Sequence, residues 1–228
     1  MGTSTLNVTD AISIGVRHFG QQWIPWATSM GVVLLIPITF IIPIIPVFDA
    51  LAVQDFFDVP TRVGMVFDQV LPWLILLLVC ACAVVVLVFW LNSMRNAYRQ
   101  CRGEAITFGS FFTLRGLLIP FFTLLSVFLI VQVGLMMCTI PGLIAMVLLM
   151  YVPFAAVEPG NTIAEAFIRG WQAFVDNLGK SISLWLLVAV VYFVAYLTYF
   201  GLLLVCPVVQ LIMMVAYLMC ARRPIALG

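Results

Sequence analysis

Charge is what this sequence most lacks. Charged residues make up 8% of the 228 residues, hydrophobic residues make up 65%, and the formal net charge is +1. Soluble domains are about one quarter charged, and a chain of this length folded in water would still expose roughly a third of its surface. The composition therefore predicts a protein whose solvent is lipid. The near-zero net charge argues against a basic nucleic-acid-binding surface, so we expect no nucleic-acid partner.

Residue types that carry chemistry are also scarce. His18 is the only histidine, and no H-E-x-x-H, P-loop or G-x-S-x-G motif occurs. The six cysteines do not have zinc-finger spacing, and most lie in or beside apolar runs, where cysteine behaves as a small hydrophobic residue. We therefore expect no catalytic residue, no metal site and no cofactor, and we interpret the chain as non-enzymatic.

Long uncharged runs are what the sequence has instead. A membrane crossing needs about 20 predominantly apolar residues, and the runs 116–157 and 181–221 are each about twice that length. Gly and Pro near their middles, in "CTIPG" at 138–142 and "YFGLLLVCP" at 199–207, predict a break and hence a hairpin in each. We therefore predict an all-α, polytopic membrane protein with six transmembrane helices, near residues 26–48, 71–92, 117–138, 141–157, 181–200 and 203–220.

The basic residues predict how these spans are oriented. Nine of the ten Lys and Arg residues fall on one side of the six-span arrangement, and only Arg62 falls on the other. Cytoplasmic loops carry the excess of Lys and Arg. We therefore expect a multi-pass protein of the bacterial inner membrane with both termini in the cytoplasm, and an extracytoplasmic loop at 49–70.

Three short segments repeat along the chain. "DAISIG" begins at Asp10, "EAITFG" at Glu104 and "EAFIRG" at Glu165, and each precedes a predicted hairpin. The chain is therefore predicted to be a single membrane domain, 1–228, built as a pseudo-threefold repeat with units at approximately 6–94, 101–157 and 161–221. Each unit is expected to open with an amphipathic helix that lies at the membrane interface.

Helical periodicity supports these interfacial helices. In the third unit the apolar stripe is Ile163, Phe167, Trp171, Phe174 and Leu178, and Thr162 with Glu165 predicts a capping box. In the first unit the stripe is Val8, Ile12, Val16, Phe19 and Trp23, and the shorter middle unit has Ile106 and Phe112. The Trp171 stripe is a candidate contact with lipid or with a partner.

The polar residues near the spans are few. Gln132 and Gln210 are candidate intramembrane polar contacts, either as hydrogen-bonding groups between helices or as the lining of a polar path. Glu158, at the end of the fourth span, is expected to cap the following helix or to pair with Arg169. Both roles are structural.

Two further groups are candidate contacts with lipid or partner. Arg95, Arg99 and Arg102 lie at spacings of four and three, so a helical continuation of the second span places them on one face. This face could contact anionic headgroups or an acidic partner. Alternatively, the three arginines reflect only the ordinary excess of basic residues on the cytoplasmic side. On the other side, the loop 49–70 mixes acidic residues with Phe56 and Phe57 and could form a docking patch.

The C-terminal part of the chain resembles a group of bacterial integral membrane proteins of unknown function, which includes the membrane domain associated with glycerophosphodiester phosphodiesterases. The resemblance rests on the segments 140–180 and 206–219, and elsewhere only on layout. The matching residues are Pro141, Glu158, Glu165, Ala166, Pro207 and Tyr217. The chain carries no phosphodiesterase domain, so the resemblance implies a six-span fold and not that activity.

Two functions from different classes follow from these features. The first is a non-enzymatic accessory, scaffold or assembly subunit of a membrane complex, or a homo-oligomer, with membrane lipids and other membrane-protein subunits or copies of itself as partners. The alternative is a transporter or channel for lipid-like or small apolar molecules, with a path past Gln132, Gln210 and the Pro-rich first span.

Overall fold

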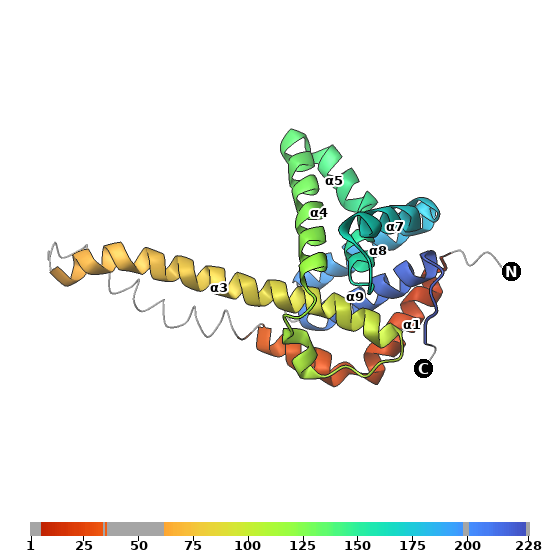
Figure 1. Cartoon of the computed structure of the whole chain (residues 1–228), viewed down its shortest axis with the longest axis horizontal. Coiled ribbons are helices and arrows are strands. Elements are labelled where there is room, and N and C mark those ends of the chain that lie inside the picture. The colour runs from red at the N-terminus through yellow and green to blue at the C-terminus, as the bar shows by residue number, and fades with distance from the viewer. Residues whose placement is uncertain (1–5, 34, 36–61, 198–200, 227–228) are drawn as a thin grey trace.

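In the part of the chain that the structure describes, all regular secondary structure is helical. The computed structural model describes residues 6–33, 35, 62–197 and 201–226, and its regular elements are all helices (Figure 1). They are α1 (Val8–Gln21), α3 (Arg62–Cys101), the 3-10 helix η1 (Phe108–Phe112), α4 (Leu118–Met137), α5 (Thr139–Leu148), α6 (Val152–Ala156), α7 (Ile163–Val175), α8 (Leu178–Leu197) and α9 (Gly201–Cys220). Residues 23–33 are also helical. The all-α prediction is confirmed for these residues.

Among the described residues, three helices are long and apolar enough to cross a membrane. They are Trp73–Cys101 within α3, Leu118–Met137 and Leu178–Leu197, which are the second, third and fifth predicted spans. The rest of the protein buries only 11%, 11% and 17% of their most apolar stretches. Helices that are this apolar and this uncovered are typical of a membrane protein. In Figure 1, α3 extends away from the other helices and runs in a different direction from α4, so these spans do not form a parallel bundle.

The other predicted spans differ from the prediction. Most of the first, residues 36–48, lies outside the described residues. The fourth is not one helix, because α5 ends at Leu148 and the chain turns before α6 begins at Val152. Ten residues of α-helix extend only about 15 Å, half the thickness of the hydrocarbon core. Pro153 lies in the first turn of α6, where its fixed φ favours a new helix start.

The sixth predicted span is α9, which forms the centre of the protein. Residues 209–218 are all buried by the rest of the chain, and α9 packs against α1, α3 and α8. The predicted break at 199–207 is partly wrong, because Pro207 lies inside α9 rather than between two helices. The other predicted break is confirmed: Cys138 is extended between α4 and α5, and these two helices pack side by side, although α5 is too short to be the predicted second span.

The prediction of a loop at 49–70 is wrong for its last nine residues. Residues 62–70 belong to α3, which begins at Arg62, and residues 49–61 lie outside the described residues. The sequence contains no proline between Arg62 and Val70, so no residue there lacks the backbone N–H that helix hydrogen bonds need.

Small residues make the closest contacts of α1 and α7 with the rest of the protein. In α1 the buried residues are Ala11, Gly15 and His18. Of the predicted stripe, Val8, Ile12 and Phe19 are partly buried against the core, while Val16 and Trp23, which follows α1, are about half exposed. A methyl group added at Gly15 would lie 2.7–2.9 Å from atoms of Ile212 on α9. The two backbones therefore approach more closely than a larger side chain would permit.

The closest contacts of α7 also use small residues. Its buried residues are Ala166, Gly170, Ala173 and Phe174, and a methyl group at Gly170 would lie 2.7 Å from Val152. Of the predicted stripe only Phe174 is buried, and the side chains of Ile163 and Trp171 remain exposed. Hydrophobic periodicity predicted this helix, and the contact of its exposed apolar side chains with lipid or a partner stays a prediction. The close approach to Val152 depends instead on a small residue, Gly170.

The middle amphipathic α-helix is also wrong. Residues 104–107 have no regular structure, and η1 follows as a five-residue 3-10 helix. Its Phe111 is fully buried between Trp26 and Phe89, with ring centroids 5.0 and 5.6 Å away. An aromatic cluster, and not an amphipathic face, therefore anchors this segment to α3.

The contact at Gly15 generates a test within one helix. Gly15→Ala is expected to lower the free energy of unfolding by about 1–3 kcal/mol, because the new methyl group meets the backbone of Ile212. Gly20→Ala, in the same helix with nothing within 4 Å, is expected to be neutral or to stabilise by up to about 1 kcal/mol through helix propensity. Thermal unfolding in mild detergent measures both. Equal unfolding temperatures for the two variants would contradict the α1–α9 contact.

Candidate functional site

The most strongly connected polar residue is Glu158, in the loop between α6 and α7. Its side chain is only 7% exposed. Gly160, with φ +84°, turns the chain in a conformation that favours glycine. Asn161 Nδ2 then donates to Glu158 Oε2 at 3.2 Å and to the carbonyl of Ala155 at 2.8 Å. Thr162 and Glu165 form the predicted capping box, which starts α7 immediately after this turn.

Two arginines from different segments pair with this carboxylate. Arg169 Nη1 on α7 lies 3.0 Å from Oε2, and Arg223 Nε of the C-terminal segment lies 2.7 Å from Oε1. Tyr217 on α9 donates its hydroxyl to Oε2 at 3.2 Å. Glu158 therefore joins α7, α9 and the C-terminal segment through one buried group. The pairing with Arg169 predicted from the sequence is confirmed.

These partners keep the carboxylate charged. Burial alone would raise the pKa of Glu158, but the hydrogen bond from Arg169, the charge of Arg223 and the hydrogen bonds from Asn161 and Tyr217 together hold the pKa below its ordinary value. The site is therefore a charged cluster at neutral pH.

The C-terminal segment closes over this cluster and reaches the end of α3. Ala226 donates its backbone N–H to the carbonyl of Cys101 at 2.9 Å, and Arg102 Nη1 donates to the carbonyl of Pro224 at 3.2 Å. A cavity of about 530 Å³ remains between these segments. It is lined by Tyr98, Arg102, Glu158, Pro159, Gly160, Asn161, Arg169, Arg223 and Pro224.

His18 lies at a neighbouring junction of α1 and α3. Its carbonyl accepts a hydrogen bond from Gln100 Nε2, and Gln100 Oε1 accepts from Trp26 Nε1 at 2.8 Å. Burial lowers the pKa of His18, against an opposing backbone hydrogen bond at Ala226. The imidazole is therefore neutral at pH 7, and the residue connects α1 to the same C-terminal segment.

The three arginines predicted to share a face have different surroundings. Arg95 Nη1 donates to the carbonyl of Arg115 at 2.6 Å, and Arg99 pairs with Glu104 at 2.7 Å. Arg102 follows the last residue of α3 and lines the cavity. Their role as lipid or partner contacts stays a prediction, and the cavity distinguishes Arg102 from the other two.

The remaining predicted contacts are dispersed. Trp171 is 46% exposed on α7, and Phe56 and Phe57 lie outside the described residues. Gln132 is partly exposed on α4, whereas Gln210 is buried on α9, and neither polar atom of its side chain has a partner among the described residues. A shared polar path stays a prediction.

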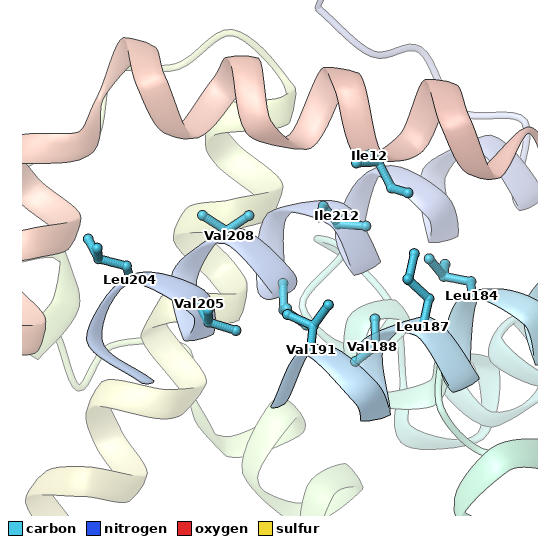
Figure 2. Close-up of a pocket in the computed structure, with 10 residues that line it drawn as sticks. Ile12, Leu184, Leu187, Val188, Val191, Leu204, Val205, Val208 and Ile212 are labelled. Carbon is cyan, nitrogen blue, oxygen red and sulfur yellow. The ribbon is translucent and has the colours of Figure 1, made fainter. Parts of the chain in front are cut away.

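A second cavity, of about 440 Å³, is entirely apolar. Figure 2 shows side chains of α1, α8 and α9 that point toward one another across it, among them Ile12, Leu187 and Val208. Neither Gln132 nor Gln210 lines it. No group of three or more His, Cys, Asp or Glu side chains that could hold a metal ion occurs in the part of the chain that the structure describes.

Sequence reasoning missed several members of the Glu158 site. In the sequence Arg223 indicates only orientation, Tyr98 belongs to no motif, and Tyr217 is singled out only by the resemblance. One signal was available: Glu158 ends one long uncharged run, and Arg222 and Arg223 end the next. Charges that border two membrane hairpins on the same side can meet at that surface.

Comparison of the chain with protein-family models, with curated proteins and with solved structures finds no match.

The Glu158 cluster predicts a stability difference between two glutamates. Glu158→Gln is expected to lower the free energy of unfolding by about 1–3 kcal/mol, because Arg169 and Arg223 lose a buried partner, with the value reduced by their partial exposure. Glu104→Gln removes the exposed pair with Arg99 and is expected to cost under about 1 kcal/mol. Thermal unfolding at pH 7 measures both changes.

The pH dependence supplies the control. A carboxyl group whose pKa is lower in the folded than in the unfolded chain stabilises the fold at pH values above its ordinary pKa of 4.5. That stabilisation is lost as the pH falls through the pKa of the group in the folded chain. The unfolding temperatures of the wild type and Glu158→Gln should therefore differ at pH 7 and converge in acid. A difference that stays constant down to low pH would show that the ion pairs are not its source.

Proposed function

We propose that this chain is a non-enzymatic integral membrane protein that acts by assembly, as an accessory, scaffold or assembly subunit of a membrane complex or as a homo-oligomer. The observation that carries the proposal is the exposure of α3. None of residues 73–88 is buried, and Trp73 and Leu77 are 72% and 69% exposed. Half of a long apolar helix is therefore left for lipid or for another membrane helix to cover.

The middle of this exposed stretch favours another helix. Residues 80–83 read Cys-Ala-Cys-Ala, and Cys80, Ala81 and Ala83 are exposed. Small residues allow the backbones of membrane helices to approach closely, and van der Waals contact drives helix association where lipid removes the hydrophobic effect. The same chain already uses small residues for the contacts of α1 and α7.

The proposed setting is the bacterial inner membrane, with both termini in the cytoplasm. The asymmetry of Lys and Arg supports this orientation. Arg102, Arg169 and Arg223 all line one cavity, which agrees with their assignment to one side of the membrane.

Helix contacts support the proposed threefold repeat. The segments that open the units are α1, η1 and α7, and they pack on α9, α3 and α6 respectively. The opening segments of the second and third units thus contact the last helix of the preceding unit, and the opening helix of the first unit contacts the last helix of the third. Ala11 and Gly15 in "DAISIG" also match Ala166 and Gly170 in "EAFIRG", and all four are buried.

The apolar cavity favours one second candidate, a transporter or channel for lipid-like or small apolar molecules. A volume of about 440 Å³ lined only by aliphatic side chains suits part of an acyl chain. This function predicts that the purified chain alone moves such molecules across a reconstituted bilayer, which the assembly function does not require.

Oxidative cross-linking in native membranes tests the assembly proposal. Copper-phenanthroline treatment is expected to join α3 to a second copy or to a partner subunit through Cys80, which is exposed in the small-residue stretch. Cys80→Ser should abolish this product. Cys138→Ser is the matched control, since Cys138 is also exposed but lies between α4 and α5, and it should leave the product unchanged.

A monomer in both membranes and mild detergent would contradict the proposal. If that monomer also moved lipid-like substrates after reconstitution, the transporter function would replace the assembly function as the proposal.

A further inference from the structure

The cavity beside Glu158 has an excess of positive charge. Its lining includes three arginines, Arg102, Arg169 and Arg223, and one acidic residue, Glu158. Arg169 and Arg223 already pair with the two carboxylate oxygens. Among the described residues Arg102 has no acidic partner, and its contact is with the carbonyl of Pro224. The lining therefore carries a formal charge of +2, three minus one.

The arginines retain hydrogen-bonding capacity. A guanidinium has five N–H donors in a planar fork, which suits the oxygens of a phosphate. The contacts described above use one nitrogen each, namely Nη1 of Arg102, Nη1 of Arg169 and Nε of Arg223. Donors on all three side chains therefore remain for a ligand.

The protein also fixes these side chains in advance. Glu158 is buried and holds Arg169 and Arg223 from opposite carboxylate oxygens, while Pro224 holds Arg102. The three come from α7, from the C-terminal segment and from the end of α3. A ligand that bridges the three arginines would bind donors that folding has already ordered, so binding would cost less side-chain entropy.

The position of the cavity indicates the source of such a ligand. Tyr98 and Arg102 line it from the end of the apolar helix Trp73–Cys101. The end of a membrane-spanning helix lies at the level of the lipid headgroups, where basic residues meet anionic lipids. The volume of about 530 Å³ exceeds that of a single water several-fold and accommodates a headgroup.

We propose that the cavity formed by Arg102, Arg169 and Arg223 binds a phosphate monoester, either as the headgroup of an anionic lipid or as a free phosphate. Such a group carries close to two negative charges at pH 7, which matches the charge of the lining. Glu158 acts as a positioning residue that orients two of the guanidinium groups. This site is independent of whether α3 associates with another helix.

The test measures binding to the full chain in mild detergent, with three probes: inorganic phosphate, dioctanoyl phosphatidic acid and dioctanoyl phosphatidylcholine. The expected result is saturable binding of the first two, with phosphatidylcholine, which lacks a monoester, binding at least about tenfold more weakly. Phosphatidic acid that binds more tightly than inorganic phosphate identifies a lipid headgroup site. Equal affinity identifies a free-phosphate site.

Arg102→Gln is expected to weaken binding of phosphatidic acid by about tenfold or more, through loss of one charge-assisted contact. The matched control is Arg17→Gln, which makes the same charge change at an exposed residue of α1 away from the cavity and should leave the affinity unchanged. Arg102→Lys keeps the positive charge but lacks the planar pair of guanidinium donors, so this variant should bind phosphatidic acid with intermediate affinity. Thermal unfolding without ligand verifies that each variant is folded.

Two outcomes would overturn the proposal. One is no saturable binding of phosphate or phosphatidic acid at millimolar concentration. The other is an equal effect of Arg102→Gln and Arg17→Gln, which would place any binding at the general basic surface.

Discussion

One buried carboxylate determines how the polar end of this protein is assembled. Glu158 leaves water only because Arg169, Arg223, Tyr217 and Asn161 all reach it, and an ionised group of this kind is costly to bury without such partners. These partners belong to the turn before α7, to α7, to α9 and to the C-terminal segment. Segments that would otherwise have little reason to meet are therefore held in one arrangement. The cavity lies between these segments, and Arg169 and Arg223 line it together with Arg102.

Close backbone approach is the second constraint, and it acts on the apolar side of the protein. Gly15 meets Ile212, Gly170 meets Val152, and Gly134 meets Gly142 between α4 and α5. In each contact a missing side chain sets the distance between two helices. Some bulky apolar side chains of the same helices, such as Phe174, pack in the core, while others, such as Val16 and Trp171, remain exposed. The molecule can therefore pack tightly at its centre and still present a largely apolar exterior.

The sequence predicted helix content, three of the candidate spans, the break between α4 and α5, the capping box and the Glu158–Arg169 pair. Each depends on a local signal: an uncharged run, a Pro-Gly pair or a short spacing. What could not be predicted depends on contacts between distant segments. The face that α1 buries is decided by α9, and η1 is held by Phe111 between Trp26 and Phe89. Arg223 belongs to the site only because the C-terminal segment returns to the end of α3.

The continuity of α3 has a mechanical consequence. Between Trp73 and Cys101 the sequence contains neither Gly nor Pro, so no ordinary cause of a kink interrupts about 44 Å of helix. Its exposed half lies free of the other described helices, and its buried half ends beside the arginine-lined cavity. Because the buried half packs against α9 and η1, the direction of the exposed half is fixed relative to the rest of the protein. A membrane or partner that holds the exposed half therefore also sets the orientation of the cavity at its other end.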